Sequence, residues 1–492
     1  MGEGAYHPLR HSEISLMTSP DYFPTLRRLA NTINESLDVM EAVFTRSQTP
    51  FPSLDFAFNP THRSEILQRD PEVAGAALNI VAAAAQLSAA VSTPGISLWN
   101  ASNSFLISAC LRVAAELNVA ELLRDPGPSG LNAKDIAAPS NADARLLARI
   151  LRLLATHQIF REVSPNIFAN NRISSFLDKG KPTKALFDNR VTRLTGSEGF
   201  GGFVELFSDD SYKSAGYLTE TILEPRDGVR DLPYTRAFNT HELFYYWLER
   251  PENAYKRERF GIGMRQSLTM EAPDAVFQGF PWKSLPEGAI LVDVGGGNGH
   301  VSMQIAQGNP QLHVVVQDLE HAVDGARQHW EEGFLSSIQE GKVKFQVHDF
   351  FTPQPIKDAS VFLLRWIVHN WPDNRVVEFL QHLRDAAQPT TRLIVIENVL
   401  SLACPPSSSS DADAERTIPG AERAKAPEPL LPNWGVGTAG AYYWDLVVHC
   451  WHGGVERTLS EFIDVLAKGG WKLVHVYHSS KTVFSHLEAI PV

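Results

Sequence analysis

The hydrophobic pattern divides the chain into a helical first half and a second half in which strands and helices alternate. From about residue 276 onward, short apolar runs rich in β-branched residues are separated by amphipathic stretches. This alternation predicts a mostly parallel sheet with helices on both faces. Only a few residues join the last two runs, so we expect those two strands to pair antiparallel. The expected strands are residues 289–294, 312–317, 342–347, 360–364, 391–399, 471–477 and 482–490.

The first half carries apolar residues at helical spacing. Residues 26–44 and 65–87 each form a long helix-like pattern, and a Pro-rich stretch separates them. Residues 104–177 then predict three helices followed by a short β-like pair, which is a winged-helix arrangement. An aromatic-rich segment follows between residues 190 and 275. Its rings either form core or wall a pocket for a flat substrate.

These patterns predict an α/β protein with three regions. We expect a helical N-terminal extension over residues 1–95 and a winged-helix-like dimerisation and substrate-lining helical domain over residues 96–275. A Rossmann-like catalytic domain with a seven-stranded sheet is expected over residues 276–492. Residues 404–432 are rich in Pro, Ser, Ala and Glu, and they predict a disordered surface insertion.

Composition and charge narrow the range of partners. The formal net charge of −12 disfavours nucleic acid or an anionic membrane, although the winged-helix pattern keeps a DNA-binding regulator as an alternative. The apolar run at 73–91 is interrupted by polar residues, so we expect a packed helix and no membrane span. Three widely spaced cysteines form neither a disulfide framework nor a metal cluster. With no secretory pattern at the N-terminus, a cytoplasmic location is expected.

The first expected strand leads directly into a glycine-rich turn, GGGNG, at Gly295–Gly299. Glycine permits a tight turn and lets a ligand lie against the main chain. A dinucleotide turn normally reads G-x-G-x-x-G, but His300 stands at the place of the third glycine. The next strand is followed by Asp318, whose carboxylate can accept hydrogen bonds from both hydroxyls of a ribose. The spacing favours S-adenosylmethionine, with a nicotinamide cofactor or a simple tight turn as alternatives.

Further chemistry-bearing residues follow the later strands, at the edge of the sheet where ligands bind in this architecture. Asp349 and Phe350 follow the third strand, where they can meet the amino group and ring face of an adenine. Arg365 and His369 follow the fourth. We therefore expect cofactor contacts and reactive groups to share this edge.

His369 is the candidate catalytic base. A histidine with a pKa near 6.5 can take up a proton at neutral pH, and a carboxylate on one ring nitrogen fixes the tautomer that leaves the other free. Glu397 in the fifth strand and Glu456 in the turn HGGVERT are candidates for this orienting role. The alternative is that both are solvated carboxylates.

The combination of GGGNG, Asp318, HDFF, RWIVHNW, VIENV and GGVERT resembles the plant and fungal S-adenosylmethionine-dependent O-methyltransferases of the caffeate and flavonoid type. The N-terminal extension and the segment PLLPNWGVG are most similar to the fungal members that decorate polyketides. The resemblance implies a homodimer that methylates a phenolic hydroxyl of an aromatic secondary metabolite without a metal. An enzyme that keeps the cofactor but performs cyclisation or dehydration is the alternative.

The resemblance also implies roles for individual residues. His369 would take a proton from the substrate hydroxyl, with Glu397 and Glu456 flanking it. The sequence departs from the usual family pattern at Arg365, where lysine is common, at Asn370, where aspartate is common, and at Phe350, which is often methionine. None of these departures removes the base. The implied cofactor contacts are Gly295, Gly296, Gly297, Asp318, Asp349, Phe350 and Arg365.

Overall fold

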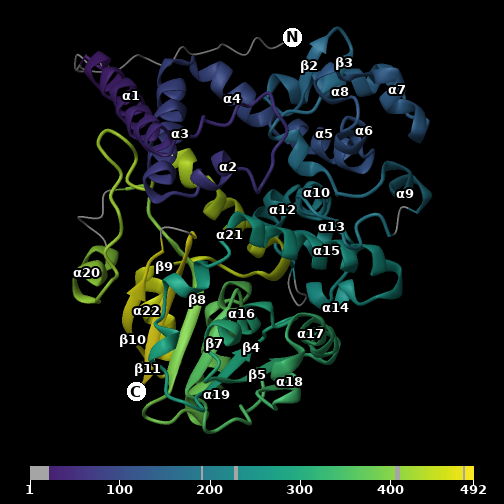
Figure 1. Ribbon diagram of the computed structural model, residues 1–492. Helices are drawn as coiled ribbons and strands as arrows, with labels where there is room; N and C mark the ends of the chain where they lie inside the picture. Colours follow the sequence, from purple (N-terminus) through teal and green to yellow (C-terminus); the bar gives the residue numbers. More distant parts are fainter. Residues whose placement is uncertain (1–20, 190–191, 227–230, 405–409, 480–481) are drawn as a thin grey trace, which may run out of the picture.

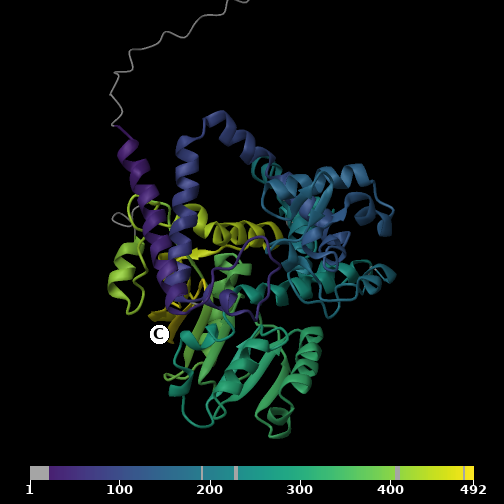
Figure 2. The same cartoon turned by 45° about the horizontal axis from the view of Figure 1, so that its top comes forward.

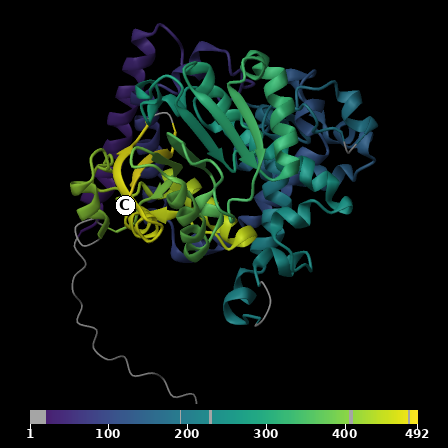
Figure 3. The ribbon, with the colours of Figure 1, turned by 90° about the horizontal axis from the view of Figure 1, so that it is seen from below.

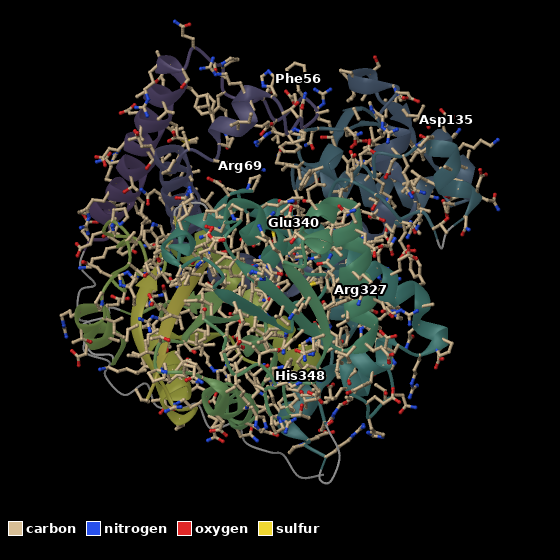
Figure 4. All side chains as sticks on the ribbon, turned by 60° about the horizontal axis from the view of Figure 1, so that its bottom comes forward. Phe56, Arg69, Asp135, Arg327, Glu340 and His348 are labelled. Atoms are coloured by element: carbon tan, nitrogen blue, oxygen red, sulfur yellow. The ribbon has the colours of Figure 1, made fainter. Side chains whose placement is uncertain are left out.

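The computed structural model describes residues 21–189, 192–226, 231–404, 410–479 and 482–492. Three regions are visible in Figure 1: purple N-terminal helices, a blue-to-teal helical domain, and a sheet domain drawn in green and yellow. In Figure 4 the three regions are marked by labelled side chains, which are Phe56 and Arg69 in the extension, Asp135 in the helical domain, and Arg327, Glu340 and His348 in the sheet domain.

The sheet domain is built on strands in the order β10-β11-β8-β7-β4-β5-β6. The strands from β8 to β6 run parallel, whereas β11 pairs antiparallel with both β8 and β10, as predicted for the last two strands. A short strand that was not predicted, β9 (Arg457–Thr458), pairs with the end of β8. All seven predicted strands are confirmed, namely β4 (Ile290–Val294), β5 (His313–Asp318), β6 (Val343–Val347), β7 (Val361–Arg365), β8 (Arg392–Leu400), β10 (Trp471–Tyr477) and β11 (Phe484–Pro491).

Helices cover both faces of this sheet, which Figure 3 shows from below. Successive side chains of a strand point to opposite faces, so Val292 packs with α19 (Asp373–Ala386) and α22 (Leu459–Lys468) on one side. Its neighbour Leu291 packs with α16 (His300–Gly308) and α17 (Glu320–Gly333) on the other. Because both faces are buried, the central strands are continuous apolar runs.

Over residues 104–177 the helical domain contains four α-helices, one more than the three that the sequence predicted, and a strand pair follows them. Strands β2 and β3 form the expected antiparallel pair, and β1 completes a three-stranded sheet. The side chain of Asp143 accepts hydrogen bonds from two backbone N–H groups and so caps α8. The elements are α5 (Phe105–Glu116), α6 (Val119–Leu122), β1 (Leu131–Asn132), α7 (Ala133–Ala137), α8 (Ala144–Thr156), β2 (Arg161–Ser164) and β3 (Ile167–Ala169).

The N-terminal extension is a helical hairpin of α1 (Phe23–Arg46) and α3 (Pro71–Val91). The helix expected at 65–87 is interrupted, because Asp70 caps a new helix that begins at Pro71; the residues before it form α2 (Arg63–Leu67). Within the described residues, α3 alone is long and apolar enough to cross a membrane. In the structure it packs along α1.

The expectation that residues 404–432 are disordered is wrong for the part that the structure describes. Residues 410–417 form α20 (Ser410–Thr417). Ala414 and Ala421 are buried in the core beside the sheet, and Leu430 is buried against the N-terminal extension. Isolated apolar residues that pack against distant elements leave no periodic pattern in a Pro- and Ser-rich stretch. A prediction from composition therefore missed the order of this segment.

Candidate active site

The glycine-rich turn lies at the switch point of the sheet. After β4 the chain builds β5 and β6 on one side and returns to build β7 and β8 on the other, and ligands bind at such points. Gly295 has a φ of 71° and its N–H donates to the carbonyl of Gln317. A Cβ on Gly295 would lie 2.7 Å from Cδ1 of Ile367 and 3.5 Å from Cε1 of Phe350. The turn is therefore packed closely against two of the loops that follow neighbouring strands.

Asp318 faces the same turn. One carboxylate oxygen accepts a hydrogen bond from the N–H of Gly297 at 2.8 Å, and the other accepts one from the N–H of Leu319 at 2.7 Å. Burial raises the pKa of Asp318, while the two backbone hydrogen bonds oppose that rise. Each oxygen keeps a lone pair for a further donor. The carboxylate is thus held where it can bind the hydroxyls of a ribose.

The surroundings of the turn fit a nucleoside. A Cβ built on Gly297 meets nothing within 4 Å, so open space lies against the main chain there. The ring of Phe350 lies beside Gly295, and it packs in T-shaped contacts with the rings of Phe379 and Trp371. Asp349, expected to meet an adenine amino group, is exposed and accepts a hydrogen bond from Phe351.

Arg365 lies at the end of β7, and its side chain is 10% exposed. Its guanidinium forms a 2.7 Å ion pair with Glu271, a partner that sequence reasoning missed, and its Cζ lies 4.0 Å from the ring centroid of Trp366. Burial lowers the pKa of Arg365, and Glu271 opposes the lowering. Glu271 also accepts from the hydroxyl of Thr482. No local pattern links residue 271 to residue 365, so only the tertiary structure reveals this pair.

His369 and its two glutamates converge in a buried cluster. Nδ1 of His369 lies 2.6 Å from Oε1 of Glu456 and 3.4 Å from Oε2 of Glu397. The side chains of all three residues are at most 3% exposed. Both carboxylates approach the same ring nitrogen, and Nε2 makes no hydrogen bond with any residue that the structure describes. The imidazole therefore has one nitrogen oriented by carboxylates and one that can accept a proton.

Glu397 binds the backbone beside the histidine as well as facing its ring. Oε1 of Glu397 accepts hydrogen bonds from the N–H groups of Ile367 and Val368 at 3.0 and 2.9 Å, so Glu397 fixes the backbone that carries the histidine. Burial alone would lower the pKa of His369, but Glu397 and Glu456 together raise it to about 8. Burial also raises the pKa of Glu397 to about 7, with the histidine opposing the rise.

The turn HGGVERT is packed directly onto the backbone of His369. A Cβ on Gly454 would lie 2.0 Å from the carbonyl oxygen of His369, and Val455 donates to that same carbonyl at 2.9 Å. The N–H of Glu456 donates to a carboxylate oxygen of Asp445. Glycine at 454 is thus required by close approach, and it brings Glu456 within reach of the imidazole.

Two tryptophans beside the base were not predicted. Nε1 of Trp444 lies 3.4 Å from Nδ1 of His369. Nδ1 donates its hydrogen to Glu456 and has no free lone pair for the indole N–H. The indole of Trp444 therefore packs against the imidazole and fixes its tilt. Trp366 has a φ of 57°, a left-handed conformation that is strained for a bulky side chain, and it turns the chain sharply between β7 and His369. The motif RWIVHNW contains Trp366, but sequence offers no sign of its backbone angle.

The same three side chains could be considered as metal ligands, because His369, Glu397 and Glu456 each place one donor atom within 4.8 Å of the others. The sequence predicted these residues as a base and its orienting carboxylates, and their spacing in the chain is not that of a metal-ligand motif. Two ligands of a tetrahedral zinc ion are separated by roughly 3.3 Å, whereas Nδ1 and Oε1 of Glu456 are 2.6 Å apart. The geometry is that of a hydrogen-bonded base.

A carboxylate placed to bind a ribose, a glycine turn at a sheet switch point and a buried, oriented imidazole are the features expected of an enzyme that transfers a group from a nucleoside cofactor. Residues 216–417 match the O-methyltransferase domain family, and residues 99–179 match the O-methyltransferase dimerisation domain. The chain is 38% identical to an O-methyltransferase of Armillaria gallica over 95% of this chain and 99% of that protein. It is 36% identical to 4-O-methyltransferase 1 of Phanerochaete chrysosporium, again over 95% and 99%. The chain therefore belongs to the S-adenosylmethionine-dependent O-methyltransferase family.

Solved structures show the same fold. The mitomycin 7-O-methyltransferase MmcR superposes with a TM-score of 0.61 at 23% identity, covering 82% of this chain and all of that one. LepI in complex with S-adenosylmethionine gives 0.61 at 20% identity, covering 85% and 94%. The cofactor of this family is S-adenosylmethionine, and the cradle of Gly295, Gly297 and Asp318 fits it.

Proposed function

We propose that the enzyme methylates a phenolic hydroxyl of an aromatic, polyketide-type secondary metabolite in the cytoplasm, with His369 as the general base. One observation carries this proposal: Ile367 contacts the glycine turn, and His369 follows two residues later with its Nε2 unbonded. The loop that carries the base therefore packs against the glycine turn. A base held this close to the cofactor can act on an oxygen that is aligned with the methyl group.

The residues divide the chemistry between them. S-adenosylmethionine supplies an electrophilic methyl group on a positively charged sulfur. Nε2 of His369 takes the proton of the acceptor hydroxyl as the oxygen bonds to the methyl carbon and the carbon–sulfur bond breaks. Glu456 stabilises the imidazolium that results. A phenol with a pKa near 10 is mostly protonated at pH 7, so a positioned base contributes about 10²- to 10⁴-fold in rate.

The rings around the base favour a flat acceptor. Trp444 lies between His369 and Phe207, with ring centroids 6.3 and 5.6 Å away, and Phe207 in turn lies 4.2 Å from Phe203. Trp366 is 6.0 Å from Trp444 on the other side. Aromatic rings pack favourably against a planar aromatic substrate, whereas an aliphatic substrate would gain less from them.

We propose that the enzyme is a homodimer formed through the helical first half. The support is the dimerisation-domain match and the surface of α4 (Pro94–Asn103), a helix with no buried residue in the single chain. Leu98 and Trp99 on α4 are 72% and 67% exposed. Apolar side chains gathered on one helix mark an interaction surface. Replacement of Leu98 by Glu should shift the enzyme from dimer to monomer in light scattering.

The proposed reaction is tested by incubating the enzyme with isotopically labelled S-adenosylmethionine and a panel of phenolic polyketides and flavonoids. The expected result is a product that has gained one labelled methyl group, with one S-adenosylhomocysteine released per product. Rearranged or dehydrated product without S-adenosylhomocysteine would instead indicate the cyclase alternative. Methylation at nitrogen or at a carboxyl group would overturn the phenolic assignment while leaving the cofactor assignment intact.

A further inference from the structure

The N-terminal extension contacts residues 429–437, a segment that leads into the active site. In Figures 1 and 2, α3 stands beside the yellow-green chain that precedes α21 (Ala439–His452). The indole N–H of Trp434 donates to the side-chain oxygen of Asn79 on α3 at 3.0 Å. Gln86, also on α3, donates to the carbonyl of Pro429 at 2.8 Å and accepts from the N–H of Leu431 at 3.3 Å. Polar groups of α3 thus fix this segment at two points.

Apolar contacts reinforce the same junction. Leu430 is buried together with Leu29 of α1 and with Ala82 and Ala83 of α3. A Cβ on Gly437 would lie 2.8 Å from Cδ1 of Leu78, so the segment lies directly against the helix. The contact is a packed interface between parts of the chain that are about 350 residues apart in sequence.

The segment continues directly into the helix that contacts the catalytic base. The short helix η11 (Gly435–Thr438) runs directly into α21. Trp444 on α21 packs against His369, and Asp445 on the same helix accepts a hydrogen bond from the N–H of Glu456. One helix therefore carries both the ring that tilts the imidazole and the group that orients its glutamate.

We propose that the N-terminal extension is a positioning element for catalysis: Asn79 and Gln86 hold α21 in the place from which Trp444 and Asp445 set the geometry of His369 and Glu456. The extension lies outside both matched domains, which begin at residues 99 and 216. The kinetic part of this inference rests on the proposed function, but the geometry can be measured without turnover.

The test compares Asn79→Leu, which removes the acceptor for Trp434, with Asn79→Asp, which retains it. Ser88→Ala, on an exposed face of α3, is the matched control. With the full-length enzyme carrying ¹³C-labelled histidine, we expect the NMR-detected titration of His369 to shift in Asn79→Leu and to match the wild type in the other two variants. For kcat we expect a loss of roughly ten- to a hundredfold in Asn79→Leu only, with unchanged calorimetric affinity for S-adenosylhomocysteine.

Gln86→Ala serves as an independent second variant and is expected to act in the same direction. An unaltered His369 titration in both Asn79→Leu and Gln86→Ala would overturn the inference. A fall in cofactor affinity and thermal stability together with kcat would also overturn it, because that outcome describes general support of the fold. If the wild type methylates no phenol, the proposed function fails, and the NMR comparison still decides the positioning role.

Discussion

Oε1 of Glu456 lies 2.6 Å from Nδ1 of His369, although 87 residues separate the two in the chain. Charge-assisted hydrogen bonds of this kind are short and strong. The bond places the proton of the neutral imidazole on Nδ1 and leaves the lone pair of Nε2 for the proton transfer that we propose. Glu397, 3.4 Å from the same nitrogen, adds a second negative charge to the cluster.

Replacement of His369 by Gln tests the base directly. Glutamine keeps a polar side chain but cannot take up a proton at neutral pH, so we expect kcat to fall about 10²- to 10⁴-fold. The affinity for S-adenosylhomocysteine, measured by calorimetry, should stay near the wild-type value. Retained turnover in this variant would rule out His369 as the base.

The pH dependence of kcat/KM follows from the raised pKa of His369, which is about 8. Below this pH the imidazole is mostly protonated and cannot act as a base. The rate should therefore increase roughly tenfold per pH unit on the acid side and level off above pH 8. In Glu456→Gln one stabilising charge is lost, the pKa of His369 falls, and the rise should move to lower pH. A midpoint that does not move would contradict the proposed orientation.

Asp318→Asn tests whether the carboxylate of Asp318 binds the ribose of the cofactor. Hydrogen bonds to a charged group contribute about 1.5–3 kcal/mol, so the dissociation constant of S-adenosylhomocysteine should rise roughly 10- to 150-fold. At saturating cofactor, kcat should change little. Asp324→Asn, on an exposed position of α17, is the control. Equal affinities in both variants would remove Asp318 from the cofactor site.

Gly295→Ala should damage cofactor binding through strain. The residue has a φ of 71°, and its new Cβ would meet Ile367 at 2.7 Å. We expect a destabilisation of about 1–3 kcal/mol together with weaker calorimetric binding of S-adenosylhomocysteine. Gly325→Ala in α17, where a Cβ meets nothing within 4 Å, should instead stabilise the protein by about 0.5–1 kcal/mol in denaturant unfolding.

A buried ionic cluster in the helical domain should contribute strongly to stability. Arg259 is 1% exposed and lies 2.8 Å from Asp209 and 2.6 Å from Asp210, two residues of a single π-helical turn. Arg259→Met removes two buried charged hydrogen bonds, while Asp209 keeps Arg112 and Lys213 and Asp210 keeps Lys256. The free energy of unfolding should therefore fall by about 1.5–3 kcal/mol. Arg46→Met, which breaks an exposed pair with Glu72, should leave the unfolding midpoint unchanged. Similar unfolding midpoints for Arg259→Met and Arg46→Met would contradict the prediction that the buried pairs stabilise the protein more than the exposed pair.

Much of the sheet domain was predictable because burial leaves a local pattern. Strands covered on both faces are continuous apolar runs, so β4, β5, β7 and β8 could be located to within one or two residues. The cofactor turn was predictable for the same local reason, since Gly295 to Gly299 and Asp318 belong to one strand–turn–helix–strand unit. His369 follows β7, and Glu397 lies near the end of β8. The two strands are adjacent and parallel, so their carboxyl ends meet at one edge of the sheet.

The order of the elements, the glycine turn and the types of residue at the sheet edge could be predicted from the sequence, because each depends on contacts between neighbours in the chain or in the sheet. Tertiary packing was needed to show that both glutamates approach the same nitrogen of His369, that Glu271 pairs with Arg365, and that α3 packs beside Trp434. Such contacts join residues from about 30 to more than 350 positions apart. They depend on how whole helices pack, and helix packing is not encoded in any local periodicity.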